Sequence, residues 1–243
     1  PASVAPETRR YSQQLTRFSS AFAFLADVSM LVMGGDLKRK EKLSARMGDI
    51  LSLMYLSSAV LKRYEAEGRQ QADAPLMHWA IWDSMFKAQN AFEGVVSNFP
   101  SRFVSTLLRR TIFPLGRPYV VPSDRLGGCV ADLLIAPSAT RDRLTAGMYL
   151  PRDENDAVGV IELALEAVIA AEPIHHKIRT AQKAGKVEGR SAQELESQSL
   201  AHGVITSAEH ALLVRARELT GEVIKVDDFP FDLGLRRSEP KSV

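Results

Sequence analysis

The chain has 243 residues, of which 45% are hydrophobic and 25% are charged, values typical of a globular protein that can bury a substantial core. A single cysteine, Cys129, excludes an intrachain disulfide and favours a reducing compartment. The net charge of +2 is unevenly divided: residues 1–150 carry 19 Lys and Arg against 13 Asp and Glu, whereas residues 151–243 carry 12 against 16. This asymmetry favours contact between the two halves or between subunits over nucleic-acid binding, which requires a concentrated basic face.

Two apolar seams predict a pair of long antiparallel helices near the N-terminus. Apolar or small residues recur in steps of three and four through residues 8–33, including Phe22, and again through residues 43–64. The resulting period of about 3.5 is typical of left-handed helix packing. Gly34 is expected to end the first helix, because glycine accepts the left-handed conformation of a helix cap. Asp27 interrupts the apolar run, so no transmembrane helix is expected.

Two further helices complete a predicted four-helix bundle. Pro75 suits the first turn of a third helix, whose tryptophan Trp79 is expected in the core. Pro100 begins a shorter fourth helix. That helix is expected to place three apolar residues on one side: Phe103, Leu107 and Leu108. Helices joined by short loops pack naturally as a bundle.

The proline-rich segment 114–122 divides the chain, and short helices are predicted beyond it. Three prolines and a glycine exclude a helix there and predict an extended crossover strap. The helices expected after it cover residues 124–135, 138–146, 157–171, 173–184, 192–201 and 208–225. Two helix starts have capping-box spacing, Ser191 with Glu194 and Thr206 with Glu209.

The fold class predicted from these patterns is all-α, in a single helical domain over residues 1–226. Its parts are a bundle core over residues 1–113, the strap over residues 114–122 and a covering layer of shorter helices over residues 123–226. Residues 227–243 lose all periodicity and are expected to form a frayed tail.

Groups with catalytic or metal-binding potential are few. Glu172 and His175 have the Glu-x-x-His spacing of di-iron bundles, but such a site needs the motif twice and Pro173 favours a helix boundary between them. His175 and His176 have no nearby cysteine or serine–acid constellation. Cys129 lies between apolar neighbours, which favours a buried, inert thiol. A ferritin-like metal protein stays an alternative that metal analysis would test.

A basic cluster is the strongest candidate for a functional surface. Its members are Lys38, Arg39, Lys40, Lys42 and Arg46. They lie where the second helix should begin, and cations there oppose the helix macrodipole, so an acidic neighbour is expected. That neighbour is the acidic half of the chain, another subunit or the rest of a parent protein. The alternative is a solvated hairpin end, partly compensated by Asp36, Glu41 and Asp49. Nucleic acid is not expected, because the aromatic residues belong to core seams.

Several blocks of sequence also resemble a known family. The most specific is GGDLKRKEKLSARMGDILSLMYLSSAVLKRYEAEG at residues 34–68. Shorter blocks follow in order: PLMHW at 75–79, IFPLGR at 112–117, PSD at 122–124, PSATRDR at 137–143, EPIH at 172–175 and VDDF at 226–229. Together they resemble the C-terminal domain of bacterial long-chain acyl-CoA dehydrogenases, the flavoenzymes that open fatty-acid β-oxidation.

The resemblance implies a parent enzyme that binds FAD and oxidises an acyl-CoA thioester to the trans-2-enoyl-CoA. In that family a carboxylate removes the α-proton while the β-hydrogen leaves as hydride to the flavin. No glycine-rich flavin motif occurs here, so the catalytic base and most of the FAD site are expected upstream. No catalytic residue is assigned to this chain, which is expected to be a piece of a longer protein and inactive by itself.

The role that the resemblance implies for this domain is assembly or dimerisation, or contact with the substrate tail or a membrane. The partners implied are the upstream dehydrogenase module, a second copy in a homodimer, and acyl-CoA as substrate of the parent enzyme. The implied location is cytoplasmic, with peripheral contact with the inner membrane. A stand-alone helical interaction module without enzymatic activity is the alternative, and the sequence upstream of Pro1 distinguishes the two.

Overall fold

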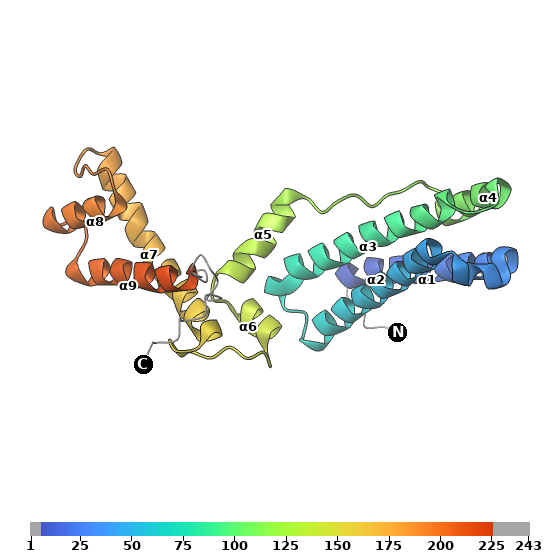
Figure 1. The fold of residues 1–243 in the computed structure, drawn as a ribbon, viewed down its shortest axis with the longest axis horizontal. Coiled ribbons are helices and arrows are strands. Elements are labelled where there is room, and N and C mark those ends of the chain that lie inside the picture. Colours follow the sequence, from blue (N-terminus) through green and yellow to red (C-terminus); the bar gives the residue numbers. More distant parts are fainter. Residues whose placement is uncertain (1–5, 226–243) are drawn as a thin grey trace, which may run out of the picture. The chain divides into compact units, whose positions relative to one another are not determined.

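The computed structural model describes residues 6–225, and every regular element within them is helical (Figure 1). The α-helices are α1 (Pro6–Met33), α2 (Glu41–Ala66), α3 (Ala74–Ser97), α4 (Arg102–Ile112), α5 (Asp124–Ile135), α6 (Ala139–Thr145), α7 (Ala157–Lys183), α8 (Ala192–Ala201) and α9 (Ser207–Val223). Two 3-10 helices, η1 (Gly34–Arg39) and η2 (Gln71–Asp73), precede α2 and α3. The predicted all-α class is confirmed.

The chain divides into two compact units, one ending at Leu134 and one beginning at Ile135. Each unit is described by itself below. The predicted single domain over residues 1–226 stays a prediction, and the predicted tail 227–243 lies outside the described residues.

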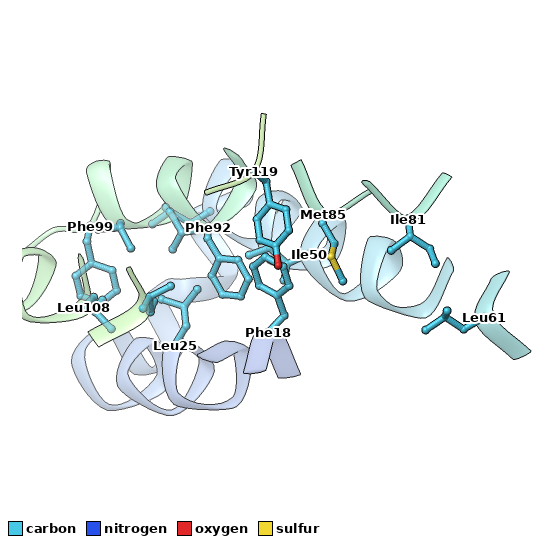
Figure 2. Packing of buried hydrophobic residues seen from close by; sticks show 14 of the residues in the cluster. Phe18, Leu25, Ile50, Leu61, Ile81, Met85, Phe92, Phe99, Leu108 and Tyr119 are labelled. Atoms are coloured by element: carbon cyan, nitrogen blue, oxygen red, sulfur yellow. The ribbon is translucent and has the colours of Figure 1, made fainter. Parts of the chain in front are cut away.

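The first unit is built on α1, α2 and α3, which pack along one another, with α4 against α3 and α1. Each of the three long helices contributes fully buried side chains to one core, among them Leu25, Ile50, Ile81 and Phe92 (Figure 2). The apolar seams predicted from their period therefore form the interior of the bundle. Gly34 has φ +49° and ends α1, as its sequence position predicts.

Four apolar residues are less buried than the sequence predicts. Phe22 and Trp79 are only half-buried, since they lie at the margin of the core rather than within it. The predicted face of α4 is wrong in part: Phe103 is 81% exposed and Leu107 is 50% exposed, whereas Leu108 and Ile112 are buried. α4 carries apolar residues on two sides. Leu108 and Ile112 are four residues apart and so lie on one side, and that side packs on the bundle.

The strap that follows α4 contains no helix and begins with a turn, in which the Gly116 N–H donates to the Phe113 carbonyl over 3.1 Å. A buried side chain fastens it to the bundle. The Gln89 Nε2 amide on α3 donates to the Tyr119 carbonyl over 2.8 Å, and the Tyr119 N–H donates to Gln89 Oε1 over 3.1 Å. The Tyr119 ring lies 5.5 Å from the Phe18 ring and meets the Trp82 ring edge-on at 5.6 Å. Burial raises the pKa of the Tyr119 phenol.

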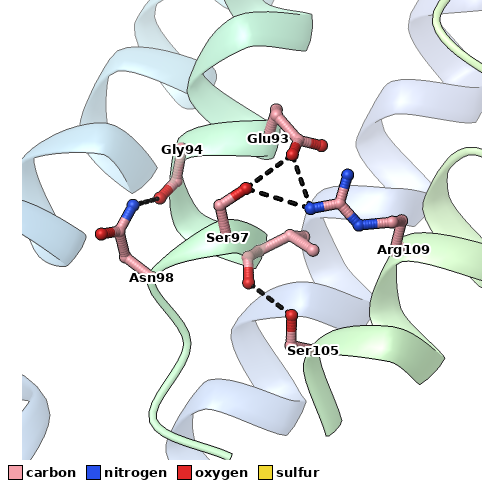
Figure 3. A network of polar contacts seen from close by, with 7 residues as sticks. Glu93, Gly94, Ser97, Asn98, Ser105 and Arg109 are labelled. Carbon is pink, nitrogen blue, oxygen red and sulfur yellow. Dashed lines mark hydrogen bonds and ion pairs between the residues drawn. The ribbon is translucent and has the colours of Figure 1, made fainter. Parts of the chain in front are cut away.

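Polar contacts hold α4 onto α3 and α1. Arg109 Nη2 lies 2.6 Å from Glu93 Oε1 and donates to the Ser97 hydroxyl over 3.0 Å (Figure 3). The Ser105 hydroxyl donates to a carbonyl near the end of α3 over 2.7 Å. The Arg17 guanidinium on α1 donates to the last carbonyl of α4 over 3.0 Å, where a cation also suits the helix dipole.

In the second unit α7 packs on α9, and α8 completes the group. The buried residues shared by these elements are Ala171, Ile174, Ile178, Ile205, Leu213 and Ala216. The predicted capping box at the start of α9 is present, since Thr206 and Glu209 exchange backbone and side-chain hydrogen bonds of 2.9 and 3.2 Å. At α8 only half of the box forms: Ser191 accepts from the Glu194 N–H over 3.2 Å.

The boundary predicted at Pro173 is wrong, because α7 continues through it. Proline lacks the N–H that would reach the carbonyl of Ile169, a loss that ordinarily breaks a helix. Ala171, Ile174 and Ile178 lie on both sides of the proline and are all buried in the core shared with α9. Continued burial of this face explains why the helix does not end there.

The start of α7 is fixed by close contacts. Asp156 accepts from the N–H groups of Val158 and Gly159, and the Gly159 bond and the Tyr149 hydroxyl hold the pKa of this carboxyl below its ordinary value. A side chain at Gly159 would place its Cβ 2.2 Å from the Asp153 carbonyl oxygen, so glycine is required by space.

One helix of the described residues passes a test for membrane-spanning length and composition, contrary to the sequence-based expectation. It lies within Thr8–Arg39, with a mean hydropathy of 1.5. The single charge of Asp27 does not reduce this mean hydropathy below that of a membrane-spanning segment. Only 17% of the most apolar window of this helix is buried, although α1 packs Phe18 and Leu25 against its neighbours.

We predict that Phe92→Ala destabilises the first unit by about 3–5 kcal/mol, because the ring is 0% exposed and its loss leaves a cavity. Phe103→Ala, with a ring that is 81% exposed, should change stability by no more than about 0.5 kcal/mol. Both tryptophans, Trp79 and Trp82, lie in α3, so their fluorescence during urea unfolding reports on this unit. Equal unfolding midpoints for the two variants would show that the core is misassigned.

We also predict that Gln89→Leu releases the strap. The substitution leaves the Tyr119 N–H and C=O without their buried partner, at a cost of about 1–3 kcal/mol for each unsatisfied group. Hydrogen exchange of the Tyr119 amide should accelerate. Asn90→Leu, on the exposed side of the same helix, is the matched control and should leave that exchange rate unchanged. Unaltered protection in Gln89→Leu would contradict the anchoring role.

Candidate functional site

The basic cluster lies at the hairpin between α1 and α2. Lys38 and Arg39 end η1, Lys40 is the N-cap residue of α2, and Lys42 lies in its first turn. We call these four residues the basic hairpin end. The turn is held by backbone and hydroxyl bonds to the Leu37 carbonyl, from Lys40 N–H over 3.1 Å and from Ser44 Oγ over 3.0 Å. The segment is therefore an ordered turn with charged side chains on its outside.

Only some of these cations oppose a helix dipole, although the sequence predicted this for all of them. Lys38 and Arg39 occupy the last turn of η1, where cations are favourable, instead of the start of α2. Lys40 and Lys42 do lie at the N-terminus of α2, which has no side-chain cap and a single acidic residue, Glu41, in its first turn. Only Lys40 and Lys42 therefore oppose the α2 dipole, because Lys38 and Arg39 belong to the C-terminal end of η1.

The four cations are exposed and weakly compensated. Arg39 Nη1 lies 3.7 Å from Asp36 Oδ1, and the two side chains are 87% and 72% exposed, so water screens the pair. Lys38, Lys40 and Lys42 make no ion pair with any described residue. The compensation expected from Glu41 and Asp49 does not take the form of ion pairs within the described residues.

Arg46 is separate from the other four cations. Its half-buried side chain lies against Gly94 on α3, where an added Cβ would come within 2.9 Å of Arg46 Cδ and Nε. Glycine at position 94 thus provides the space for this arginine. The structure places Arg46 in the contact between α2 and α3 and not on the hairpin end.

Exposed apolar residues beside the hairpin end were not identified from the sequence. Met30 is 60% exposed, Leu31 is 86% exposed and Val32 is 42% exposed, at the end of α1. Of these three, the apolar seam predicted over residues 8–33 includes only Val32, and its predicted interior position is wrong. The sequence does contain a sign of this exposure, which is three successive large apolar residues next to a basic turn. One side of a helix cannot bury three successive residues, so at least one of them had to be exposed.

The remaining candidates do not come together as a site. Cys129 is exposed, so the predicted buried thiol is wrong; it lies on the outer side of α5, whose buried residue is Val130. Glu172 Oε1 lies 3.7 Å from Arg179 Nη1, in an ion pair whose two side chains are each 63% exposed. Within residues 6–225, no three His, Cys, Asp or Glu side chains gather in the manner of a metal site.

Comparison with known families decides what kind of domain this is. The family described as acyl-CoA dehydrogenase, C-terminal, bacterial type matches residues 1–229, which is nearly the whole chain. The chain belongs to this family. Its helical fold agrees with the resemblance drawn from the blocks at residues 34–68 and beyond. No solved structure matches this acyl-CoA dehydrogenase C-terminal domain.

Proposed function

We propose that this domain completes an FAD-dependent enzyme that oxidises fatty acyl-CoA to trans-2-enoyl-CoA, and that its role there is assembly. The observation that carries the proposal is the family match over residues 1–229. The reacting groups would belong to a dehydrogenase module upstream in the same protein, which acts as a homodimer in the cytoplasm. An independent helical interaction module is the competing proposal, and it predicts no such module upstream.

The aromatic recess beside the strap, lined by Phe18, Phe113 and Tyr119, has a volume of only about 10 Å³. A flavin ring system needs far more space than one water molecule occupies. We therefore assign FAD and the chemical step to the upstream module and give no residue here a role in them.

The surface proposed for assembly is the basic hairpin end. Its four cations are exposed, and three of them make no ion pair with a described residue, so an acidic partner surface would gain charge pairing at little cost in lost contacts. The partner proposed is an acidic surface of the parent enzyme, on its own chain or on the second subunit.

A second role is favoured by the apolar residues beside these cations. Met30 and Leu31 are exposed next to the basic turn, a combination that suits the interface of an anionic membrane. Peripheral contact of the parent enzyme with the inner membrane is therefore a second proposal for the same end of the molecule.

The first experiment compares the parent protein with this chain alone. The parent should be yellow, with stoichiometric FAD, and should oxidise long-chain acyl-CoA, whereas the isolated chain should be folded, helical, colourless and inactive. A parent without flavin or dehydrogenase activity would refute the proposal, and a yellow, active isolated chain would refute the assignment of the chemistry upstream.

The second experiment reverses the charges at the hairpin end in the parent enzyme. Lys38→Glu/Lys40→Glu/Lys42→Glu should weaken subunit or domain association in sedimentation at low salt, and the difference should shrink at high salt, because screening weakens peripheral charge contacts. In the isolated chain the same variant should keep its unfolding free energy within about 1 kcal/mol, since exposed charges contribute little individually.

The control for that experiment carries the same change of charge elsewhere on the surface. Lys62, Lys183 and Arg190 are all exposed and lie far from the hairpin in sequence, and their reversal to Glu should leave association unchanged. If both variants associate identically at every salt concentration, the hairpin end is a solvated surface with no role in association.

A further inference from the structure

A groove of about 570 Å³ in the second unit lies where α7 and α8 end. Its polar side chains are His176, Lys177, Thr180, Lys186 and His202, and no carboxylate of residues 6–225 lines it. Ala181, Ala184 and Val204 provide an apolar part of the wall. The groove is thus basic on one part of its surface and apolar on another.

The basic side chains are not needed to cap the two helices. At the end of α7 the Lys186 N–H donates to the Ala181 carbonyl over 3.0 Å, and the preceding glycine N–H bonds the next carbonyl. At the end of α8 the Val204 N–H donates to the Ser199 carbonyl over 2.8 Å in the same manner. Lysine and histidine often serve as caps at such ends. Here the backbone does so, which leaves the side chains of Lys186 and His202 for another partner.

The charges in this groove also differ from those in the rest of the unit. Most of its other cations pair with carboxylates: Arg141 with Glu162, Arg152 with Glu166, Arg179 with Glu172, Arg215 with Glu154 and Arg217 with Glu196. Lys177 also pairs with a carboxylate, that of Glu209. Lys186 and the two imidazoles have no carboxylate partner within the described residues. The groove therefore concentrates uncompensated hydrogen-bond donors in a unit where most cations are paired.

We propose that this groove binds a small organic phosphate. An ammonium and two imidazole rings around one opening suit a tetrahedral anion, whose oxygens accept hydrogen bonds from several directions. The volume exceeds that of a bare phosphate ion, and the Ala181, Ala184 and Val204 wall would contact the carbon part of the ligand. The proposal is independent of the role given to the hairpin end.

The test is a titration of the full ¹⁵N-labelled chain with glycerol 2-phosphate at constant ionic strength, followed by NMR. The amide signals of Gly185 and Gly203, which lie in the two turns, should shift and saturate together. Glycerol and acetate serve as the uncharged and carboxylate counterparts and should cause no saturable shift. A shift that grows without saturating, or acetate binding as tight as that of the phosphate, would overturn the assignment.

Variants localise the site. Lys186→Gln and His202→Gln should each weaken binding by about tenfold or more, because each removes a charge-assisted hydrogen bond. Lys183→Gln is the matched control: it removes an exposed lysine from the same end of α7 that does not line the groove, and it should change the affinity by less than about twofold. Equal losses for Lys183→Gln and Lys186→Gln would show that the anion responds only to overall charge. The wild-type titrations decide the proposal even where a variant fails to fold.

Discussion

The contact on which the path of the strap depends is the double hydrogen bond between the Gln89 side chain and the Tyr119 backbone. A segment with three prolines cannot satisfy its backbone groups in a helix, and two valines alone do not make a sheet. The buried amide supplies one donor and one acceptor at the point where the strap crosses α3. Because the bond fixes position 119, the Tyr119 ring closes the core over Phe18 and Trp82. The course of the chain from α4 to α5 then follows.

The periodic parts of this fold were predictable from the sequence, and the choice between competing surfaces was not. The seam of α2 is interior as its spacing predicts, and the bounds of α5 and α8 agree with local start and stop signals. Periodicity shows that α4 is amphipathic, but its packing against α3 decides which apolar side is covered. Phe103, which was predicted to lie on the covered side, is therefore exposed. The amide at Gln89 bonds a backbone 30 residues away, a contact for which the sequence carries no local signal.

The sequence was sufficient to locate the basic cluster, but not to predict which of its cations oppose a helix dipole. Five cations close together are visible in any sequence, yet their effect depends on whether each follows one helix or precedes the next. η1 places Lys38 and Arg39 at the favourable end of a helix and leaves Lys40 and Lys42 at the unfavourable end of another. The space beside Gly94 removes Arg46 from the group altogether. None of these distinctions is encoded in spacing alone, because each rests on a tertiary neighbour.

Pro173 gives α7 a mechanical property that an uninterrupted helix would not have. On its N-terminal side the helix is tied to α6 by Arg141 Nη2, which donates to both carboxylate oxygens of Glu162 over 2.6 and 2.8 Å. On its C-terminal side Ile174 and Ile178 are buried with α9. The missing N–H lies between these two anchored stretches, where separating one turn from the next breaks the fewest bonds. Local opening would begin there, and the two ends of one continuous helix would then open and close as separate cooperative segments.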